Sequence, residues 1–479
     1  MERLQSTAPG GFMHHLPALA AGLLAGIGFY IFPAETFFKY GAAALAGLAV
    51  LFNPLAGLYL LAGLLPFLPN LSLLLLAILT ALSFLLYRLR TGEGFHLAPL
   101  PIQPALSVFL FVIVFYSLTS LTPGGSTREL GLYLSALALL LILFNHVQKK
   151  DQLYVFLVLS LLAAFFVSLY GIYQYIIGVP VQAAWVDVEH NPLLQTRVYS
   201  VFGNPNVLAE YLILVIPFGL ALFLTAHNTW KKLLFLSITA AMGITMLMTF
   251  SRGGWMGLAV AITIFALLRE RRVFVLLFLL VLAAVVYMPD VVLQRAATMF
   301  SVTDSSNLYR ITVWQESLNI ARDFWATGVG FGHKAFQEIY PYYMITRVKT
   351  PFHVHNTFLQ YLVETGVLGL MALLWLLASI FKQGLKGLGR LRDGFLRHVL
   401  MAALAATAGI LAHGLGEHVL YLPKIIFLFW INVGIIFLCI RLDAVPAAGF
   451  SEHASGGVEQ RGTGVWNAQE SEVMSEESE

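Results

Sequence analysis

The residues best suited to chemistry gather in one long polar segment, residues 289–355, which interrupts a series of apolar stretches. The segment contains Arg310, Lys349, His353 and His355, and the next apolar stretch begins directly after the second histidine. Cationic and titratable groups therefore converge on the end of an apolar stretch. Because that end would lie at a membrane surface, the pattern favours a site for a lipid-borne substrate.

His355 is the candidate general base, since a neutral imidazole can take a proton from a sugar hydroxyl near pH 7. It directly precedes Asn356 and Thr357, either of which could cap a helix that starts there. The positive end of that helix would disfavour the protonated imidazole and keep it available as a base. His353 is expected to contact substrate and to matter less. The alternative is that His355 only anchors the helix.

Two arginines are candidates for binding a diphosphate. Arg252 lies in a Ser-Arg-Gly-Gly sequence, residues 251–254, between two apolar stretches. The planar guanidinium suits phosphate oxygens, and the glycines allow a bulky headgroup to approach. Arg310 lies on an expected amphipathic helix that could hold it at headgroup depth. The alternative for both is a basic side chain that only reaches to the membrane surface.

No metal site and no cofactor are expected. His353 and His355 do not share a helix face, and no carboxylate lies near them in the sequence, so zinc is disfavoured. Residues 187–190, Asp-Val-Glu-His, imitate a metal-binding motif of sugar-nucleotide enzymes. A solvated loop is the better explanation, because sugar nucleotides are cytoplasmic and this loop is expected outside.

The composition indicates the kind of protein that positions these groups. Of 479 residues, 59% are hydrophobic and 11% are charged, and the mean hydropathy is +0.80. Soluble domains of this length do not have such values, so the chain is expected to be an all-α polytopic membrane protein. The single cysteine, Cys439, lies in an apolar run and leaves no possibility of an internal disulfide.

Apolar stretches of roughly 20 residues predict the membrane spans. Fourteen are expected, at residues 16–32, 38–52, 54–68, 71–87, 104–121, 129–146, 152–176, 205–226, 232–250, 253–268, 273–288, 356–381, 396–419 and 423–440. The weakest assignment is the region of residues 41–68, where the main break is Asn53-Pro54. Removing two spans there would leave twelve.

Five basic clusters fall on alternate connections, at residues 88–90, 149–150, 231–232, 269–272 and 382–397. By the positive-inside rule this side is cytoplasmic, which places both termini inside and residues 289–355 outside. We therefore expect a multi-pass protein of the cytoplasmic (inner) membrane with an extracytoplasmic site.

The chain divides into five expected segments: amino-terminal membrane helices (1–200), helices with the outward Ser-Arg-Gly-Gly turn (201–288), the extracytoplasmic catalytic loop (289–355), carboxy-terminal helices (356–443) and a disordered cytoplasmic tail (444–479). Inside the long loop, residues 304–325 have helical periodicity, with Ile311, Trp314, Leu318, Ala321 and Trp325 forming one apolar stripe. Asp304 or Ser305 could cap this helix.

Four segments together resemble the O-antigen ligase and O-antigen polymerase superfamily of bacterial membrane glycosyltransferases. They are Phe-Gly-Asn-Pro-Asn-Val-Leu-Ala at 202–209, Phe-Ser-Arg-Gly-Gly at 250–254, Tyr-Arg-Ile-Thr-Val-Trp at 309–314, and His-Val-His-Asn-Thr-Phe-Leu-Gln at 353–360 with Glu-Thr-Gly at 364–366. The resemblance covers roughly residues 200–370, and its specificity lies in the order of the segments around one long loop.

The resemblance implies a metal-independent transfer of a glycan from undecaprenyl diphosphate to an acceptor hydroxyl outside the membrane. Arg252 and Arg310 would hold the diphosphate and His355 would act on the acceptor. Six further residues are expected to contact substrate: Asn204, Asn206, Glu210, Trp314, Lys349 and His353. Glu210 is included because a carboxylate within a span is costly and is often functional.

The acceptor stays open, since family members transfer glycans to lipid A core, to growing polysaccharide or to protein. Polymerisation of lipid-linked repeat units is therefore an alternative to ligation. A transporter of lipid-linked glycan is an alternative of another class, but transporters place ionisable groups near the membrane midplane. Here the polar groups collect at one face. The bilayer is an expected partner and nucleic acid is not.

Overall fold

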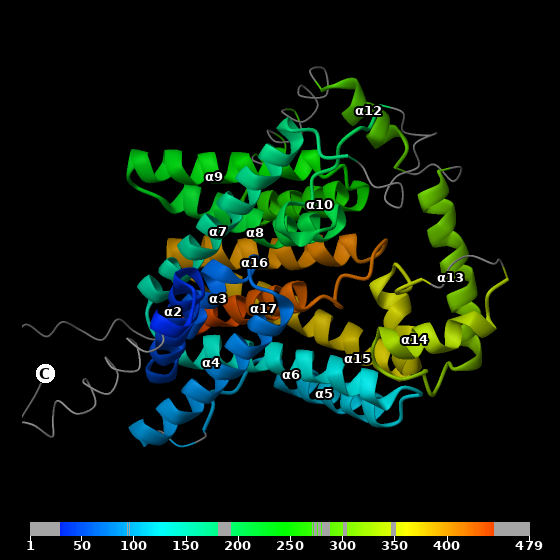
Figure 1. Ribbon diagram of the computed structural model, residues 1–479, viewed down its shortest axis with the longest axis horizontal. Helices are drawn as coiled ribbons and strands as arrows, with labels where there is room; N and C mark the ends of the chain where they lie inside the picture. Colours follow the sequence, from blue (N-terminus) through cyan, green and yellow to red (C-terminus); the bar gives the residue numbers. More distant parts are fainter. Residues whose placement is uncertain are drawn as a thin grey trace, which may run out of the picture. The chain divides into compact units, whose positions relative to one another are not determined.

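A computed structural model describes residues 29–444, except for residues 93, 95, 181–192, 271, 273–274, 276–278, 280–287, 300–303 and 346–350. Across these residues the chain is built from helices, and the only β pairing is an isolated bridge between Pro180 and Thr196. Figure 1 shows the helices packed side by side, which confirms the expected all-α fold.

Ten of the described helices are long and apolar enough to cross a membrane. They are α2 (Ala34–Phe52), α4 (Asn70–Thr91), α6 (Pro123–His146), α7 (Lys150–Ile176), α8 (Pro205–Thr225), α9 (Thr229–Met248), α10 (Arg252–Arg269), α15 (Thr357–Leu388), α16 (Gly394–His413) and α17 (Pro423–Ala444). Two shorter apolar helices, α3 (Pro54–Leu64) and α5 (Gln103–Leu118), accompany them.

These twelve helices correspond to twelve of the fourteen expected spans. The expected span at 273–288 and most of that at 16–32 lie outside the described residues. The expected span 54–68 is a helix of 11 residues, too short to cross a bilayer alone. Its start agrees with the break at Asn53, whose side chain accepts a hydrogen bond from the Leu55 amide at 3.0 Å and caps α3. The helix ends early, at Leu64, because Pro66 follows and has no backbone N–H to continue the helical hydrogen bonds.

The centre of the bundle is formed by α8, α16 and α17, whose side chains are mostly buried. Helix α16 packs between α8 and α10. Helices α10 and α16 approach closely because glycines meet at their contact: a Cβ added to Gly257 would lie 2.8 Å from the Gly409 carbonyl oxygen. This close packing brings the start of α10 and the end of α16 together, where the candidate residues lie.

The long polar segment contains α12 (Asp290–Ala297), α13 (Ser305–Asp323), α14 (His333–Ile339) and the 3-10 turn η3 (Tyr340–Tyr342). In Figure 1, α13 and α14 lie beyond one end of the bundle, near the start of α15. The Asp304 side chain caps α13 by accepting hydrogen bonds from the amides of Ser306 at 3.1 Å and Asn307 at 3.3 Å, as expected from the sequence.

The expected apolar stripe of α13 is not its main packing face. Val313 and Ile320 are fully buried against α14 and the start of α15. Leu318 and Trp325, by contrast, are 53% and 62% exposed. The helix buries the neighbouring face because α14 and α15 offer an apolar surface there, and periodicity alone could not reveal that partner.

A glycine-containing loop fastens the long segment to the bundle. The Val329 amide donates to the Val363 carbonyl at 3.0 Å, and the Gly330 amide donates to the Glu364 carbonyl at 2.9 Å. These carbonyls are available because α15 is interrupted at Gly366, where φ is +60°. Gly330 has a φ of +118°, and a Cβ there would lie 2.0 Å from the Ser120 hydroxyl, so no larger residue fits.

Connections that carry basic clusters meet at the end of the bundle opposite the start of α10 and the end of α16. Lys150 pairs with Asp393 at 2.5 Å, and Arg269 Nη1 lies 2.9 Å from His398 Nε2. Three of the five basic clusters of the sequence are thereby brought to one end of the bundle.

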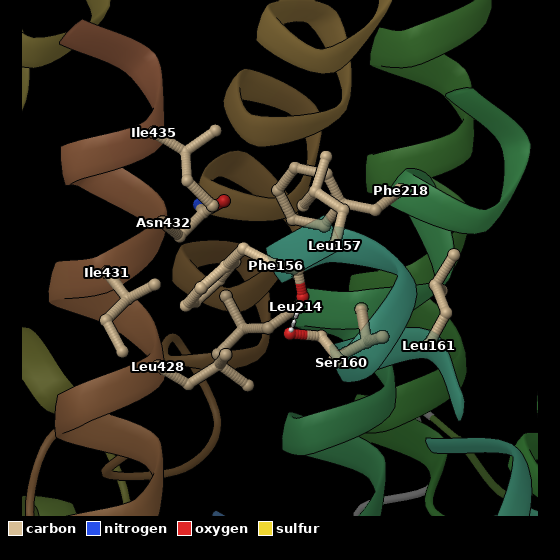
Figure 2. A pocket seen from close by; sticks show the side chains of 11 residues that line it. Phe156, Leu157, Ser160, Leu161, Leu214, Phe218, Leu428, Ile431, Asn432 and Ile435 are labelled. Atoms are coloured by element: carbon tan, nitrogen blue, oxygen red, sulfur yellow. Dashed lines mark hydrogen bonds between the residues drawn. The ribbon is translucent and has the colours of Figure 1, made fainter. Parts of the chain in front are cut away.

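A small cavity of about 20 Å³ lies among α7, α8 and α17 (Figure 2). Its lining is apolar except for Ser160 and Asn432. Ser160 donates to the Phe156 carbonyl at 3.0 Å, and Asn432 Nδ2 donates to Thr407 Oγ1 at 2.7 Å. This space could hold a water molecule but no glycan or lipid headgroup. The substrate site must lie elsewhere.

Candidate active site

Glu417 is the centre of the polar cluster at the bundle end, although the sequence assigned no role to it. It lies in the connection between α16 and α17 and is 5% exposed. One carboxylate oxygen accepts from His355 Nδ1 at 2.7 Å and from the His418 amide at 3.2 Å. The other accepts from Arg310 Nη2 at 3.2 Å and Asn206 Nδ2 at 3.3 Å. Four donors thus surround one buried carboxylate.

Glu417 is ionised at neutral pH. Burial by itself would raise the pKa of this carboxyl, but His355, then His353 and Arg310, outweigh burial and hold the pKa well below its ordinary value. A buried carboxylate that accepts several hydrogen bonds and faces positive charge favours the ionised form. Glu417 therefore supplies a fixed negative charge beside His355.

His355 is held with one ring nitrogen bound and the other available. Asn356 caps α15 by accepting from the Leu359 amide at 3.0 Å, which confirms one of the two expected caps. His355 just before it has a φ of +57°, a conformation that is uncommon for any residue but glycine and that often occurs at functional sites. Its Nδ1–H donates to Glu417, so the neutral ring presents Nε2 as an acceptor. No hydrogen bond to this Nε2 exists among the described residues.

His353 has a supporting position. It is 4% exposed, and its Nδ1 accepts a hydrogen bond from the His355 amide at 3.2 Å. Burial lowers the pKa of His353 well below its ordinary value, and the neighbouring His355 lowers it further. A neutral, buried ring of this kind fixes the backbone of His355. Little of the ring is exposed, and the substrate contact expected of His353 stays a prediction.

His353, His355 and Glu417 lie close enough together to hold a metal ion, but their ligand atoms already take part in hydrogen bonds. The Nδ1 lone pair of His353 is used by an amide, and the Nδ1 of His355 carries a proton toward Glu417. Both oxygens of Glu417 are already saturated by donors, one of them the cationic Arg310. No carboxylate lies near these histidines in the sequence, but folding brings in Glu417, 62 residues after His355.

A cavity of about 260 Å³ opens beside this cluster and combines cationic and apolar walls. Arg252, Arg310 and Asn307 provide its polar groups. The remaining lining residues are mostly apolar or glycine: Gly253, Met256, Met299, Ile311, Trp314, Leu415 and Gly416. Such a lining suits a ligand with a charged headgroup and a hydrocarbon portion.

The two arginines of this cavity differ in their bonding. Arg310 is 23% exposed in its side chain and bonds to Glu417. Arg252 is 6% exposed and donates to the Thr298 carbonyl at 2.6 Å, to Asp304 at 2.9 Å and to Asn307 at 3.1 Å. Arg252 thus fixes the start of α13 as well as adding positive charge, whereas Arg310 keeps more of its surface free for a ligand.

Two further arginines, to which the sequence did not point, lie close to Arg252 and Arg310. Arg197 and Arg295 are each 4% exposed, and they donate to the backbone carbonyls of Thr249 and Phe250 respectively. Burial lowers the pKa of Arg197, and the nearby Arg295, Arg310 and Arg252 lower it further. Since arginine stays charged in proteins, four guanidinium groups create a positive region suited to an anion.

The other predicted contact residues have different positions. Trp314 lines the cavity, and its Nε1 donates to the His355 carbonyl at 3.2 Å. Asn204 caps α8 with its side-chain oxygen. Glu210 is 1% exposed within the bundle, and its carboxylate lies 3.5 Å from His413. Lys349 and the motif at residues 187–190 lie outside the described residues.

Asn206 is placed between charged groups. Its side-chain oxygen accepts from Ser251 Oγ at 2.9 Å and from Arg197 at 3.3 Å, so its amide group must point toward Glu417. The predicted substrate contact is thus a residue that orients Glu417.

Comparison with known protein families agrees with this geometry. Residues 237–374 match the family described as O-antigen ligase, and this stretch includes Arg252, Arg310 and His355. Glu417 lies beyond the matched stretch. No curated protein matches the chain significantly. The family match supports membership of the O-antigen ligase superfamily and an activity of the ligase or polymerase type, and the ten long apolar helices are consistent with a multi-pass membrane protein.

Proposed function

We propose that the protein transfers a glycan from a polyprenyl diphosphate, undecaprenyl diphosphate in bacteria, to an acceptor hydroxyl without the help of a metal. The observation that carries this proposal is the 2.7 Å contact between His355 Nδ1 and Glu417, which leaves Nε2 of the same ring as a proton acceptor. A base oriented by a carboxylate is the arrangement that activates a hydroxyl nucleophile.

The cavity lined by Arg252 and Arg310 is the proposed donor site. Its guanidinium groups would face the diphosphate, and Met256, Ile311 and Trp314 would contact the first isoprene units. The diphosphate leaves with additional negative charge, which fixed cationic groups stabilise without reorganising. A sugar diphosphate is already activated, so positioning and charge stabilisation account for most of the catalytic requirement.

His355 would act on the acceptor. The acceptor hydroxyl gives its proton to His355 Nε2 as its oxygen attacks the anomeric carbon. The bond between that carbon and the phosphate oxygen breaks, and its electron pair leaves with the polyprenyl diphosphate. The ionised Glu417 stabilises the imidazolium that forms, while Arg310 bonds to the same carboxylate and borders the donor cavity.

We place the reaction at the outer face of the cytoplasmic membrane, with both termini inside. The basic connections at the other end of the bundle support this orientation, because the positive-inside rule favours a cytoplasmic location for them. Ligation to a lipid or protein acceptor is the favoured reaction, and polymerisation of lipid-linked repeat units uses the same chemistry.

The decisive experiment incubates purified protein with a defined undecaprenyl-diphosphate glycan and candidate acceptors, and identifies the product by mass. A product on lipid A core or protein indicates a ligase, and a longer lipid-linked glycan indicates a polymerase. Movement of the labelled lipid across vesicles with no change of its glycan would instead indicate a transporter and contradict the proposal.

A further inference from the structure

An exposed aromatic ring lies three residues before His355. Phe352 is 47% exposed, although it belongs to the segment that leads into the buried His353. His333 of α14 stacks against its ring, with centroids 4.5 Å apart and an angle of 27° between the planes. One face of the Phe352 ring is therefore covered by His333, while the residue keeps about half of its surface exposed.

The ring is held in place from several sides. His333 Nδ1 lies 3.5 Å from the Glu129 carboxylate, without forming a hydrogen bond to it. Tyr421 lies 5.6 Å from Phe352 at an angle of 54°. On the rim, Gln337 donates from its side chain to the Phe352 carbonyl at 3.3 Å. An exposed ring fixed in this way loses little conformational freedom when a ligand binds to it.

A chain of ring contacts connects Phe352 with the candidate base. The ring centroid of Phe352 lies 5.9 Å from that of His353, which lies 4.4 Å from that of His355. A single imidazole thus separates the exposed ring from the proposed catalytic one. A ligand group seated on Phe352 would be a direct neighbour of a hydroxyl that faces His355.

We propose that Phe352, supported by His333 and Tyr421, is a saccharide-binding platform for the acceptor. The face of an aromatic ring is partially negative and attracts the partially positive C–H groups on the apolar face of a pyranose. The rim supplied by Gln337 adds an amide that can bond to sugar hydroxyls. The arginines line a different cavity, so this surface suits the neutral acceptor sugar and not the diphosphate donor.

This inference rests on the proposed function, because it assigns a second substrate to the same site. It commits to a sugar next to the attacking hydroxyl. A lipid headgroup seated on Phe352 would be the competing occupant, since aromatic rings also lie at membrane surfaces. If a sugar of the acceptor occupies Phe352, altering the ring should change acceptor binding. If a lipid headgroup occupies it, altering the ring should change donor binding.

The test compares Phe352→Leu, which keeps an apolar side chain but removes the aromatic face, with Phe352→Trp, which keeps it. Tyr342→Leu is the matched control, since Tyr342 is an 83% exposed aromatic residue of the same long segment. Phe352→Leu should raise the acceptor KM about threefold to tenfold, as expected from losing one aromatic contact. The donor KM and kcat should stay within twofold of wild type, roughly the scatter of such measurements. Phe352→Trp and the control should behave as wild type.

A binding measurement without donor separates this inference from the proposed function. Saturation-transfer NMR would use lipid-free core oligosaccharide and free repeat-unit oligosaccharide as probes. Wild type should bind at least one of them, and Phe352→Leu should bind it more weakly. No binding of either probe to wild type, equal binding by both proteins, or an altered donor KM in place of the acceptor KM would overturn the platform. A wild-type protein that binds saccharide but transfers no glycan would instead contradict the proposed function.

Discussion

Replacement of Glu417 by glutamine tests the organisation of the site most severely. The carboxylate accepts four hydrogen bonds, two on each oxygen. An amide has one accepting oxygen and one donating NH₂ group. If the amide oxygen faces His355, its NH₂ group faces Arg310 and Asn206, which are themselves donors. If it is turned over, its NH₂ group faces the proton of His355 and disrupts the orientation of the base.

The expected loss follows from these contacts. Glu417→Gln weakens or breaks the charge-assisted bonds to His355 and Arg310, each worth about 1.5 to 3 kcal/mol. Together they amount to about 3 to 6 kcal/mol, which corresponds to a fall in turnover of about 10²- to 10⁴-fold. The same range is typical for loss of general-base assistance. Glu417→Asp keeps the charge on a shorter side chain and should give an intermediate rate.

The assay is a single turnover that follows release of polyprenyl diphosphate from a labelled donor, with donor binding and thermal stability measured separately. Glu338→Gln is the matched control, because Glu338 is an exposed carboxylate of α14. Turnover by Glu417→Gln within threefold of wild type, in a folded protein that binds donor, would refute the role given to this carboxylate. That limit lies well below the loss expected from the contacts.

Three further results are expected. Arg310→Lys and Arg252→Lys should both lose most transfer activity and bind donor more weakly, because an ammonium group lacks the planar donor geometry of guanidinium. Arg252→Lys should also lower the melting temperature, because it loses the bonds to Thr298 and Asp304. Normal donor turnover by both variants would contradict the diphosphate assignment. Burial lowers the pKa of His418 to about 3. The folded protein thus favours the neutral His418 ring. Its contribution to the unfolding free energy is complete above the pKa of the unfolded state, near 6.5, and is lost as the pH falls toward 3. Between pH 6.5 and 4.5 the unfolding free energy of His418→Gln should therefore decrease less steeply than that of wild type, with a slope smaller by up to about 1.4 kcal/mol per pH unit. Equal slopes for the two proteins would contradict this. Gly330→Ala should lower the melting temperature, since its φ is +118° and the added carbon would overlap Ser120, and an unchanged value would show that the loop can shift at no cost.

Local sequence signals identified much of the framework and some of the site. Apolar stretches predicted the helices, Asp304 and Asn356 are caps as expected, and His355 directly precedes α15. These features depend on nearby residues and on general periodicity. The break at Asn53-Pro54 was also visible, but the early end of α3 at Leu64 was not.

The electrostatic arrangement could not be predicted in the same way. Glu417 lies in a short connection without a motif, and its role depends on donors from four separated parts of the chain. Arg252 was predicted from its neighbours, but its main partner, Asp304, lies 52 residues later. Glu210 looked functional because it is a carboxylate in a span, yet α16 supplies His413 beside it. A sequence gives the types of such groups, whereas their pairing depends on tertiary packing.

The most direct test of the central claim compares glycan transfer by His355→Ala and His353→Ala in proteoliposomes that contain labelled lipid-linked donor and an acceptor. We expect His355→Ala to bind donor and to lose about 10²- to 10⁴-fold in turnover, and His353→Ala to lose much less. Equal losses in the two variants, or a loss of donor binding by His355→Ala with no separate effect on turnover, would contradict the role of His355 as the base.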